Sequence, residues 1–273
     1  MTKVKAKPFL KWAGGKTQLL PTIDSFLPES FSREKEITYI EPFVGGGAML
    51  FFMLQKYPNI KRAIINDINP HLVNTYRVIR EQPIPLIEYL TELQFKYKEL
   101  ADYDAQKDLY LNIRNRFNND NLTAIEEAAY MIFMNRTCFN GLYRENSKGG
   151  FNVPFGKYPN PTICDDSLIM ADSEILKRVE ILNGDFSHTR DYIAGYTFFY
   201  FDPPYRPLDA TSSFNSYVKE AFDDNEQRRL HDYFAELSAI GCHELLSNSD
   251  GRGKNEADTF FDDLYQDFII EVV

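Results

Sequence analysis

The chain has 273 residues, of which 44% are hydrophobic and 26% are charged, as in an ordinary globular protein. This length accommodates one large α/β domain together with a smaller inserted or appended domain. The sequence contains no uncharged apolar run as long as a membrane span, and its polar, basic start lacks the apolar core of a signal peptide. We therefore expect a cytoplasmic protein without a membrane partner.

The cysteines and histidines argue against a metal centre. The three cysteines are widely spaced without a CxxC pair, and the four histidines form no HExxH motif. Reduced thiols in a cytosolic protein account for the cysteines better than metal ligands do. We predict no bound metal.

The formal net charge of −10 argues against a nucleic-acid binder, but the charges are unevenly distributed. Five lysines precede the first acidic residue, Asp24, and the acidic excess lies after Asp165. A basic, DNA-facing surface on an acidic body is therefore compatible with the sequence.

The N-terminal stretch over residues 8–17 contains the only tryptophan, Trp12, between two lysines and before a Gly-Gly pair. Its Gly-Gly-Lys-Thr is not a phosphate-binding P-loop, because Leu10 stands where that motif needs its first glycine. These residue types favour a ligand-contacting loop over a core anchor. A helix is predicted over residues 18–26.

A strand predicted over residues 37–40 is followed by Glu-Pro-Phe-Val-Gly-Gly-Gly-Ala and by a helix over residues 49–55. This order is typical of a nucleotide-type cofactor site. A dinucleotide fingerprint would need a third glycine where Leu50 stands, which weakens a dehydrogenase interpretation. The next predicted strand, residues 62–68, ends around Asp67, which is placed to bind ribose hydroxyls or to cap the helix that follows.

Residues 70–134 contain several helical stretches, such as 86–100 and 122–134, and these predict an inserted helical domain. The segment over residues 135–158 differs, because turn signals divide it and Arg, Lys, Asn and aromatic residues alternate along it. It predicts a β-ribbon that fits a major groove, with arginine reading guanine and asparagine reading adenine. Phe139 is placed to wedge between bases. The alternative is a plain surface hairpin.

The run Tyr-Thr-Phe-Phe-Tyr-Phe-Asp-Pro-Pro-Tyr, residues 196–205, predicts a strand buried on both faces and ended by two prolines. It places Asp202 and Tyr205 at the carboxyl edge of a sheet, where ligands bind. Another strand over residues 180–186 carries Asp185. A helix over residues 225–240 and strands over 242–246 and 268–273 complete the prediction.

Asp-Pro-Pro-Tyr suits chemistry on an exocyclic amino group, whose lone pair is delocalised into the ring. A carboxylate from Asp202 and the carbonyl of Pro203 can accept its two hydrogens, while Tyr205 stacks on the base. A base inside a duplex must first be flipped out. The tetrapeptide resembles motif IV of methyltransferases that act on adenine N6 or cytosine N4, and alone it does not separate DNA from RNA or protein substrates.

Five stretches taken together resemble the Dam-like DNA adenine-N6 methyltransferases. They are Lys-Trp-Ala-Gly-Gly-Lys, Glu-Pro-Phe-Val-Gly-Gly-Gly, Asn-Asp-Ile-Asn, Asn-Arg-Thr to Val-Pro-Phe-Gly-Lys-Tyr, and Asp-Pro-Pro-Tyr, in that order. The resemblance implies a Rossmann-like α/β methyltransferase sheet with an inserted, mostly helical recognition domain that carries a β-hairpin. Residues 1–69 and 165–273 would form the catalytic domain, and residues 70–164 the recognition domain.

The resemblance also implies roles for individual residues. S-adenosylmethionine would be bound by Trp12, Lys16, Phe43, Gly45, Asp67, Asp185, Phe186 and Asp202. The target adenine would be held for direct methyl transfer by Asp202, Pro203 and Tyr205. Double-stranded DNA, with GATC as the implied site, would face Lys11, Asn140, Leu142, Arg144, Pro154 and Tyr158.

One departure and three alternatives accompany this interpretation. Relatives usually continue past a strand like residues 268–272 with a basic loop and a last strand, whereas this chain stops at Val273. We therefore expect an irregular or exposed sheet edge. The alternatives are an RNA or cytosine-N4 methyltransferase, a DNA-binding protein that has lost catalysis, and a nicotinamide dehydrogenase.

Overall fold

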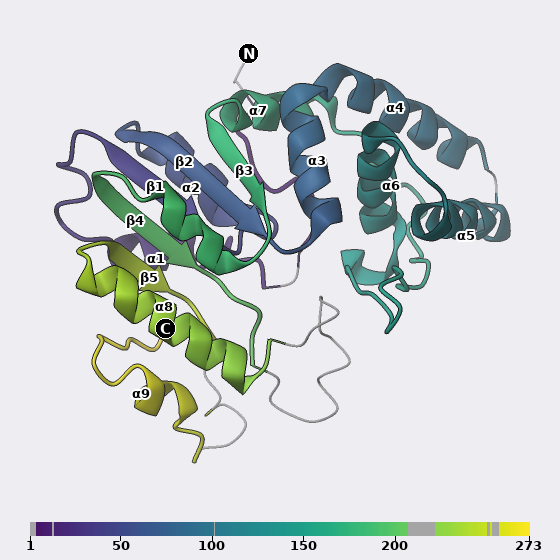
Figure 1. The fold of residues 1–273 in the computed structure, drawn as a ribbon. Helices are drawn as coiled ribbons and strands as arrows, with labels where there is room; N and C mark the ends of the chain where they lie inside the picture. Colours follow the sequence, from purple (N-terminus) through teal and green to yellow (C-terminus); the bar gives the residue numbers. More distant parts are fainter. Residues whose placement is uncertain (1–3, 13, 101, 207–221, 250–251, 253–256) are drawn as a thin grey trace.

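The centre of the molecule is a five-stranded, all-parallel sheet with the strand order β3-β2-β1-β4-β5 (Figure 1). The computed structural model describes residues 4–12, 14–100, 102–206, 222–249, 252 and 257–273. The strands are β1 (Ile37–Glu41), β2 (Ile60–Asp67), β3 (Val179–Asn183), β4 (Tyr196–Phe201) and β5 (His243–Leu246).

The direction in which strands are added reverses between β1 and β4. From β1 the chain adds β2 and β3 on one side, and it then returns to place β4 and β5 on the other. Ile40 of β1 therefore pairs with Ile64 of β2 and with Phe199 of β4. Ligands of open α/β sheets bind at the carboxyl ends of the strands beside such a reversal.

Helices cover both faces of the sheet, as the uninterrupted apolar strands require. One face packs against α2 (Ala48–Lys56), α3 (Pro70–Glu81) and α7 (Asp166–Leu176), and the other against η2 (Phe186–Tyr192) and α8 (Asp224–Ala239). Alternate strand residues divide between two apolar clusters, so that Phe198 and Tyr200 belong to one and Phe199 and Phe201 to the other. Two short helices add to these clusters: α1 (Leu20–Ser25) contributes Ile23 to the first, and α9 (Phe260–Leu264) packs Phe261 and Leu264 against the second.

Three helices stand together at the side of the molecule away from α8 and α9, as Figure 1 shows. They are α4 (Pro83–Glu99), α5 (Tyr103–Asn119) and α6 (Ala124–Thr137). Helix α6 begins with a capping box, in which the Thr123 side chain accepts from the Glu126 N–H and Glu126 accepts from the Thr123 N–H. A short 3₁₀ turn, η1 (Phe139–Gly141), follows α6.

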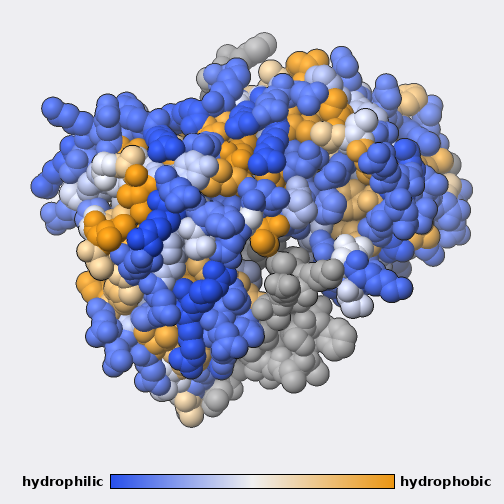
Figure 2. Space-filling model, in the orientation of Figure 1, coloured by the Kyte–Doolittle hydropathy of each residue, from blue (hydrophilic) through white to orange (hydrophobic). Residues whose placement is uncertain are grey.

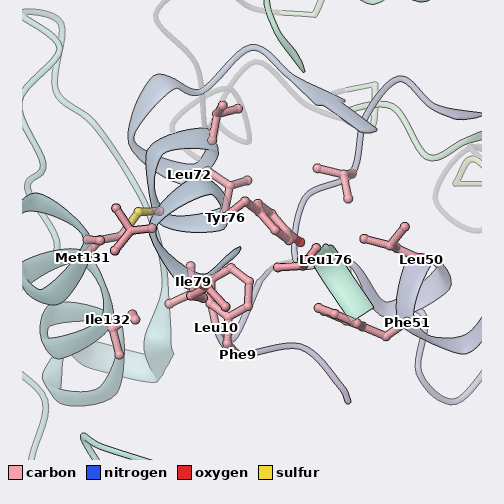
Figure 3. Close-up of a cluster of buried hydrophobic side chains, with 14 of the residues drawn as sticks. Phe9, Leu10, Leu50, Phe51, Leu72, Tyr76, Ile79, Met131, Ile132 and Leu176 are labelled. Carbon is pink, nitrogen blue, oxygen red and sulfur yellow. The ribbon is translucent and has the colours of Figure 1, made fainter. Parts of the chain in front are cut away.

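One apolar cluster joins the helical group to the sheet, and Figure 3 shows its centre. Tyr76 of α3 is fully buried within it, and its hydroxyl donates to the Gly45 carbonyl at 2.9 Å. The side chains around it come from the N-terminal segment, α2, α3, α6 and α7, and include Phe9, Leu10, Leu50, Phe51, Leu72, Ile79, Met131, Ile132 and Leu176.

The predicted α/β class and most predicted elements are confirmed, with three corrections. Residues 268–273 form no strand, so β5 is the last strand of the described sheet, and its four residues are all partly exposed. The predicted ribbon reverses direction but is held by the isolated bridges Cys138–Phe155 and Glu145–Phe151 rather than by regular strands. Strand β3 ends at Asn183, which leaves Asp185 at the start of η2.

The surface in Figure 2 is mainly hydrophilic, with apolar residues scattered over it. Among the helices that the structure describes, none has both the length and the apolar character needed to cross a membrane.

Candidate active site

Asp202 follows the last residue of β4, at the carboxyl edge of the sheet beside β1. The Lys16 ammonium lies 3.3 Å from its Oδ1, and only 9% of the Lys16 side chain is exposed. Burial raises the pKa of the Asp202 carboxyl to about 6, and the Lys16 charge opposes that rise. The carboxyl is therefore mainly ionised at neutral pH, as a hydrogen-bond acceptor must be.

Tyr205 lies over the same pair of charges. Its ring centroid is 4.3 Å from the Lys16 Nζ, and its hydroxyl is 3.4 Å from Asp202 Oδ1. The ring is 37% exposed, while Pro203 is buried. The buried Gln227 of α8 donates to the Pro204 carbonyl at 3.1 Å and so fixes this turn from outside the motif. Sequence analysis missed Gln227, because its role depends on how α8 packs.

A second acid, Glu41, ends β1 beside the Asp202 strand, and sequence analysis gave it no role. It is 2% exposed, and the Tyr39 hydroxyl donates to its Oε1 at 2.5 Å. Burial raises its pKa to about 8; the Tyr39 hydrogen bond opposes the rise and the Asp202 charge adds to it. Glu41 is therefore mainly neutral at pH 7, while Asp202 carries the charge.

Asp67 ends β2 and faces the glycine loop. Its Oδ2 accepts the Gly45 N–H at 3.1 Å, and its Oδ1 accepts the Asn69 N–H at 2.9 Å. Burial raises the pKa of Asp67 to about 6, although these backbone donors oppose the rise. Capping of α3 is done by Asn69, whose side chain accepts from His71 and Leu72 N–H groups. The capping alternative for Asp67 is therefore wrong.

Trp12 packs directly on the glycine loop. A Cβ at Gly45, where φ is +48°, would approach Trp12 Cδ1 to 2.9 Å, and one at Gly46 would approach Trp12 Cβ to 3.0 Å. The indole also stacks on Tyr143, with ring centroids 5.4 Å apart and planes inclined by 25°. The loop thus needs glycine for Trp12 to sit where it does.

Asp185 and Phe186 lie where β3 leads into η2, and both contact Arg229 of α8. The guanidinium donates to the two Asp185 carboxylate oxygens at 2.9 and 2.7 Å, and it lies 4.0 Å from the Phe186 ring centroid. Arg229 holds the pKa of Asp185 well below its usual range. Phe43 joins this group, with its ring centroid 5.3 Å from that of Phe186.

The residues predicted to face DNA lie on one segment, residues 139–158, together with Lys11. The Phe139 N–H donates to the Pro154 carbonyl at 2.9 Å, and the Asn140 N–H donates to the Tyr158 hydroxyl at 3.1 Å. The Lys11 Nζ is 5.3 Å from the Tyr158 ring centroid. Phe139, Asn140 and Pro154 are exposed, whereas Leu142, Arg144 and Tyr158 are partly buried.

Asn135 connects this segment to the N-terminal loop, and sequence analysis named it only as the start of a turn-rich stretch. Its side chain accepts the Lys11 N–H at 2.9 Å and donates to the carbonyls of Lys11 and Gly141, each at 2.8 Å. The structure therefore brings together two groups from distant parts of the chain: Trp12 and Asp67 around the glycine loop, and Lys16, Asp202 and Tyr205 at the end of β4. Within the described ranges, no three His, Cys, Asp or Glu side chains gather in a metal-binding arrangement.

Comparison with known proteins decides the family. The model of the D12 class N6 adenine-specific DNA methyltransferases matches residues 12–273. The chain belongs to this D12 class. The predicted Dam-like resemblance is confirmed, and the protein is an adenine-specific DNA methyltransferase.

Named relatives agree with the D12 assignment. Type II methyltransferase M.MjaIII of Methanocaldococcus jannaschii is 45% identical over 272 residues, which cover 99% of this chain and 91% of the relative. Type II methyltransferase M1.LlaDCHI of Lactococcus lactis subsp. cremoris is 40% identical over 276 residues, covering 99% and 88%. A DNA adenine methylase of Vibrio cholerae is 35% identical over 248 residues, covering 90% and 82%. A D12 methyltransferase requires a methyl donor, so the dehydrogenase interpretation is wrong.

Proposed function

We propose that this enzyme transfers a methyl group from S-adenosylmethionine to N6 of an adenine flipped out of double-stranded DNA, in the cytoplasm. The observation that carries the proposal is Asp202, held 3.3 Å from Lys16 at the sheet reversal, at the end of the strand that pairs with β1, from which the chain enters the glycine loop. Family membership supplies the reaction class.

The residues around the glycine loop suit S-adenosylmethionine. Asp67 presents a half-buried carboxylate, which suits ribose hydroxyl donors at the end of β2. The rings of Phe43 and Phe186 offer apolar surface for an adenine. Trp12, Lys16, Gly45, Asp185 and Asp202 complete the proposed set. When bound, the cofactor supplies an electrophilic methyl group on a sulfonium.

The protein's part in the transfer is to make the target amino group nucleophilic. The Asp202 carboxylate and the Pro203 carbonyl accept the two N6 hydrogens, which favours the pyramidal nitrogen with a free lone pair. The partly exposed Tyr205 ring stacks on the flipped base. Lys16 keeps Asp202 ionised, and Gln227 fixes the turn through Pro204.

We further propose that residues 1–69 and 165–273 form the catalytic domain, and that residues 70–164 form the recognition domain. The DNA-facing residues are then Lys11, Phe139, Asn140, Leu142, Arg144, Pro154 and Tyr158. The exposure of Phe139 suits an apolar wedge, and Arg144 and Asn140 suit readout of guanine and adenine edges. GATC is the proposed site.

The test is to incubate the protein with labelled S-adenosylmethionine and duplexes with and without GATC, and to identify the modified nucleoside by mass. We expect N6-methyladenine in the GATC duplex. N4-methylcytosine, or label only in an RNA control, would instead support the RNA or cytosine-N4 alternative. Duplex binding without any transfer would support the DNA-binding alternative.

Asp202→Ala tests the central residue. We expect transfer to fall below detection, because the carboxylate that accepts an N6 hydrogen is lost, while circular dichroism stays native. Asp120→Ala is the matched control, since Asp120 forms an exposed pair with Arg116 on α5; its activity should equal that of the wild type. Retained turnover in Asp202→Ala would refute the assigned role.

A further inference from the structure

Trp12 lies between two parts of the molecule that bind different ligands in the proposed function. The indole lies against the glycine loop at Gly45, and it also stacks on Tyr143. Tyr143 is only 4% exposed and belongs to the segment proposed to face DNA. The stack therefore joins the cofactor loop to the recognition segment directly.

Tyr143 is itself fixed from both sides. Its hydroxyl donates to Glu145 Oε1 at 2.6 Å, and Glu145 forms the antiparallel bridge to Phe151 that holds the hairpin. Burial raises the pKa of the Tyr143 hydroxyl, while the Asn69 side chain beside it opposes that rise. The Asn69 N–H in turn donates to Asp67. Tyr143 thus contacts neighbours of both proposed ligand sites.

Asn135 provides a second, independent connection. Its side-chain amide accepts the Lys11 N–H and donates to the carbonyls of Lys11 and Gly141. The approach is close, because a Cβ at Gly141 would lie 2.5 Å from the Lys11 side chain. Asn135 therefore ties the recognition turn to Lys11, the residue next to Trp12.

We propose that Tyr143 and Asn135 are positioning residues that couple DNA recognition to cofactor binding, so that each ligand strengthens the binding of the other. The inference rests on the proposed function. A ligand that orders the shared unit of residues 11–12, 14–16 and 139–145 removes part of the ordering cost of the second ligand. The coupling must be the same whichever ligand binds first.

The experiment measures the affinity of a labelled GATC duplex by anisotropy, with and without saturating S-adenosylhomocysteine, which cannot react. In the wild type we expect the cofactor product to tighten duplex binding by about 5- to 150-fold, the usual range of such coupling. The reciprocal titration follows Trp12 fluorescence, and because Trp12 is the only tryptophan, its signal reports this loop alone.

Variants test whether the coupling depends on the Tyr143 ring and on the Asn135 side-chain amide. Tyr143→Leu removes the stack and should lower the coupling ratio to within about twofold of unity, whereas Tyr143→Phe keeps the ring and should retain the wild-type ratio. Asn135→Ser breaks the second connection and should also lower the ratio. Tyr89→Phe is the control, because it removes a tyrosine hydroxyl contact to Tyr130 between α4 and α6 and should change nothing.

The outcomes separate this inference from the proposed function. A wild-type ratio of one, or wild-type ratios in both folded Tyr143→Leu and folded Asn135→Ser, would overturn the coupling. If Tyr143→Leu does not fold by circular dichroism, Asn135→Ser alone decides. Absence of methylation by the wild type on every duplex would overturn the proposed function, whereas methylation with an unaltered ratio in the variants would overturn only the inference.

Discussion

Asp202 and Glu41 are acids at the ends of two neighbouring strands, and their surroundings separate their pKa values. Burial raises both, but Lys16 limits the Asp202 pKa to about 6, while that of Glu41 reaches about 8. Two adjacent ionised carboxylates would repel each other, so the neutral Glu41 lets Asp202 keep its charge. Divergent pKa values in neighbouring acids are typical of sites with distinct acid and acceptor roles.

The pH dependence of activity follows from the Asp202 pKa. Protonated Asp202 is a much weaker acceptor for its N6 hydrogen, so kcat/KM for DNA should fall as the pH drops through about 6. Removing the Lys16 charge raises the Asp202 pKa, so in Lys16→Met the acid limb should move to higher pH. Asp67, which is proposed to bind the cofactor, also has a pKa of about 6. The pH–rate profile is therefore measured at saturating cofactor, so that weaker cofactor binding at low pH does not produce the acid limb.

Lys56→Met is the matched control for that profile. Lys56 pairs with Asp24 on the surface and lies outside the proposed site. Its loss should leave the acid limb where it is in the wild type. A Lys16→Met limb at the wild-type pH would show that Asp202 is not the titrating group.

Site residues that form a short contiguous motif could be predicted from the sequence. Site residues whose role depends on packing between distant segments could not. Asp202, Pro203 and Tyr205 follow one another in a short motif, so the pattern names them together. Tyr143 and Asn135 differ, because their partners Trp12 and Lys11 are more than 120 positions away along the chain. Only the folded arrangement brings these pairs into contact.

At the scale of elements, the glycine turn between β1 and α2 carries a testable steric demand. Gly47 has φ +76°, and a Cβ there would lie 2.5 Å from the Tyr76 hydroxyl that donates to Gly45. Gly47→Ala therefore adds a clash to the ordinary cost of a left-handed alanine. We expect it to lower the free energy of unfolding by about 2–5 kcal/mol, measured by urea denaturation.

Gly195→Ala separates the cost of the steric clash from the cost of a left-handed alanine. Gly195 also has a positive φ, +57°, but a Cβ there meets nothing within 4 Å. It should therefore cost only the backbone strain, about 1–2 kcal/mol. Equal losses in the two variants would mean that Tyr76 yields without cost and that the turn does not depend on this contact.

Helices and strands could be predicted from the local sequence pattern where the surrounding structure also favoured them. The apolar run of β4 is buried on both faces, as its composition predicts. Residues 268–273 are also mainly apolar and rich in β-branched residues, yet they form no strand, and Ile269 is 92% exposed. A strand needs a partner edge as well as propensity, and the sequence pattern contains only the propensity.

At the scale of the whole molecule, the N-terminal segment over residues 6–12 ties the layers together. Its carbonyl groups accept hydrogen bonds from Gln55 of α2 and from Arg136 and Asn135 of α6. On α7, Asp172 accepts the Lys7 N–H at 3.1 Å through Oδ1. Asp172 is fully buried, and burial raises its pKa to about 8. Burial disfavours its ionisation and the Lys7 contact only partly offsets that, so ionising Asp172 lowers the stability of the folded state.

The stability of the protein should depend on pH through Asp172. An unfolded aspartate ionises near pH 4, so between about pH 4 and pH 8 the folded state binds the extra proton. The free energy of unfolding then contains a contribution that is fully present below pH 4 and is lost as the pH rises towards 8, by at most about 1.4 kcal/mol per pH unit.

Asp172→Asn isolates that contribution, because asparagine keeps an oxygen for the Lys7 N–H and does not ionise. Urea denaturation at pH 5, 6, 7 and 8 should show that the variant gains stability relative to the wild type as the pH rises. Asp120→Asn, at an exposed pair on α5, serves as the control and should track the wild type. Parallel pH dependences for Asp172→Asn and the wild type would mean that Asp172 does not titrate in this range.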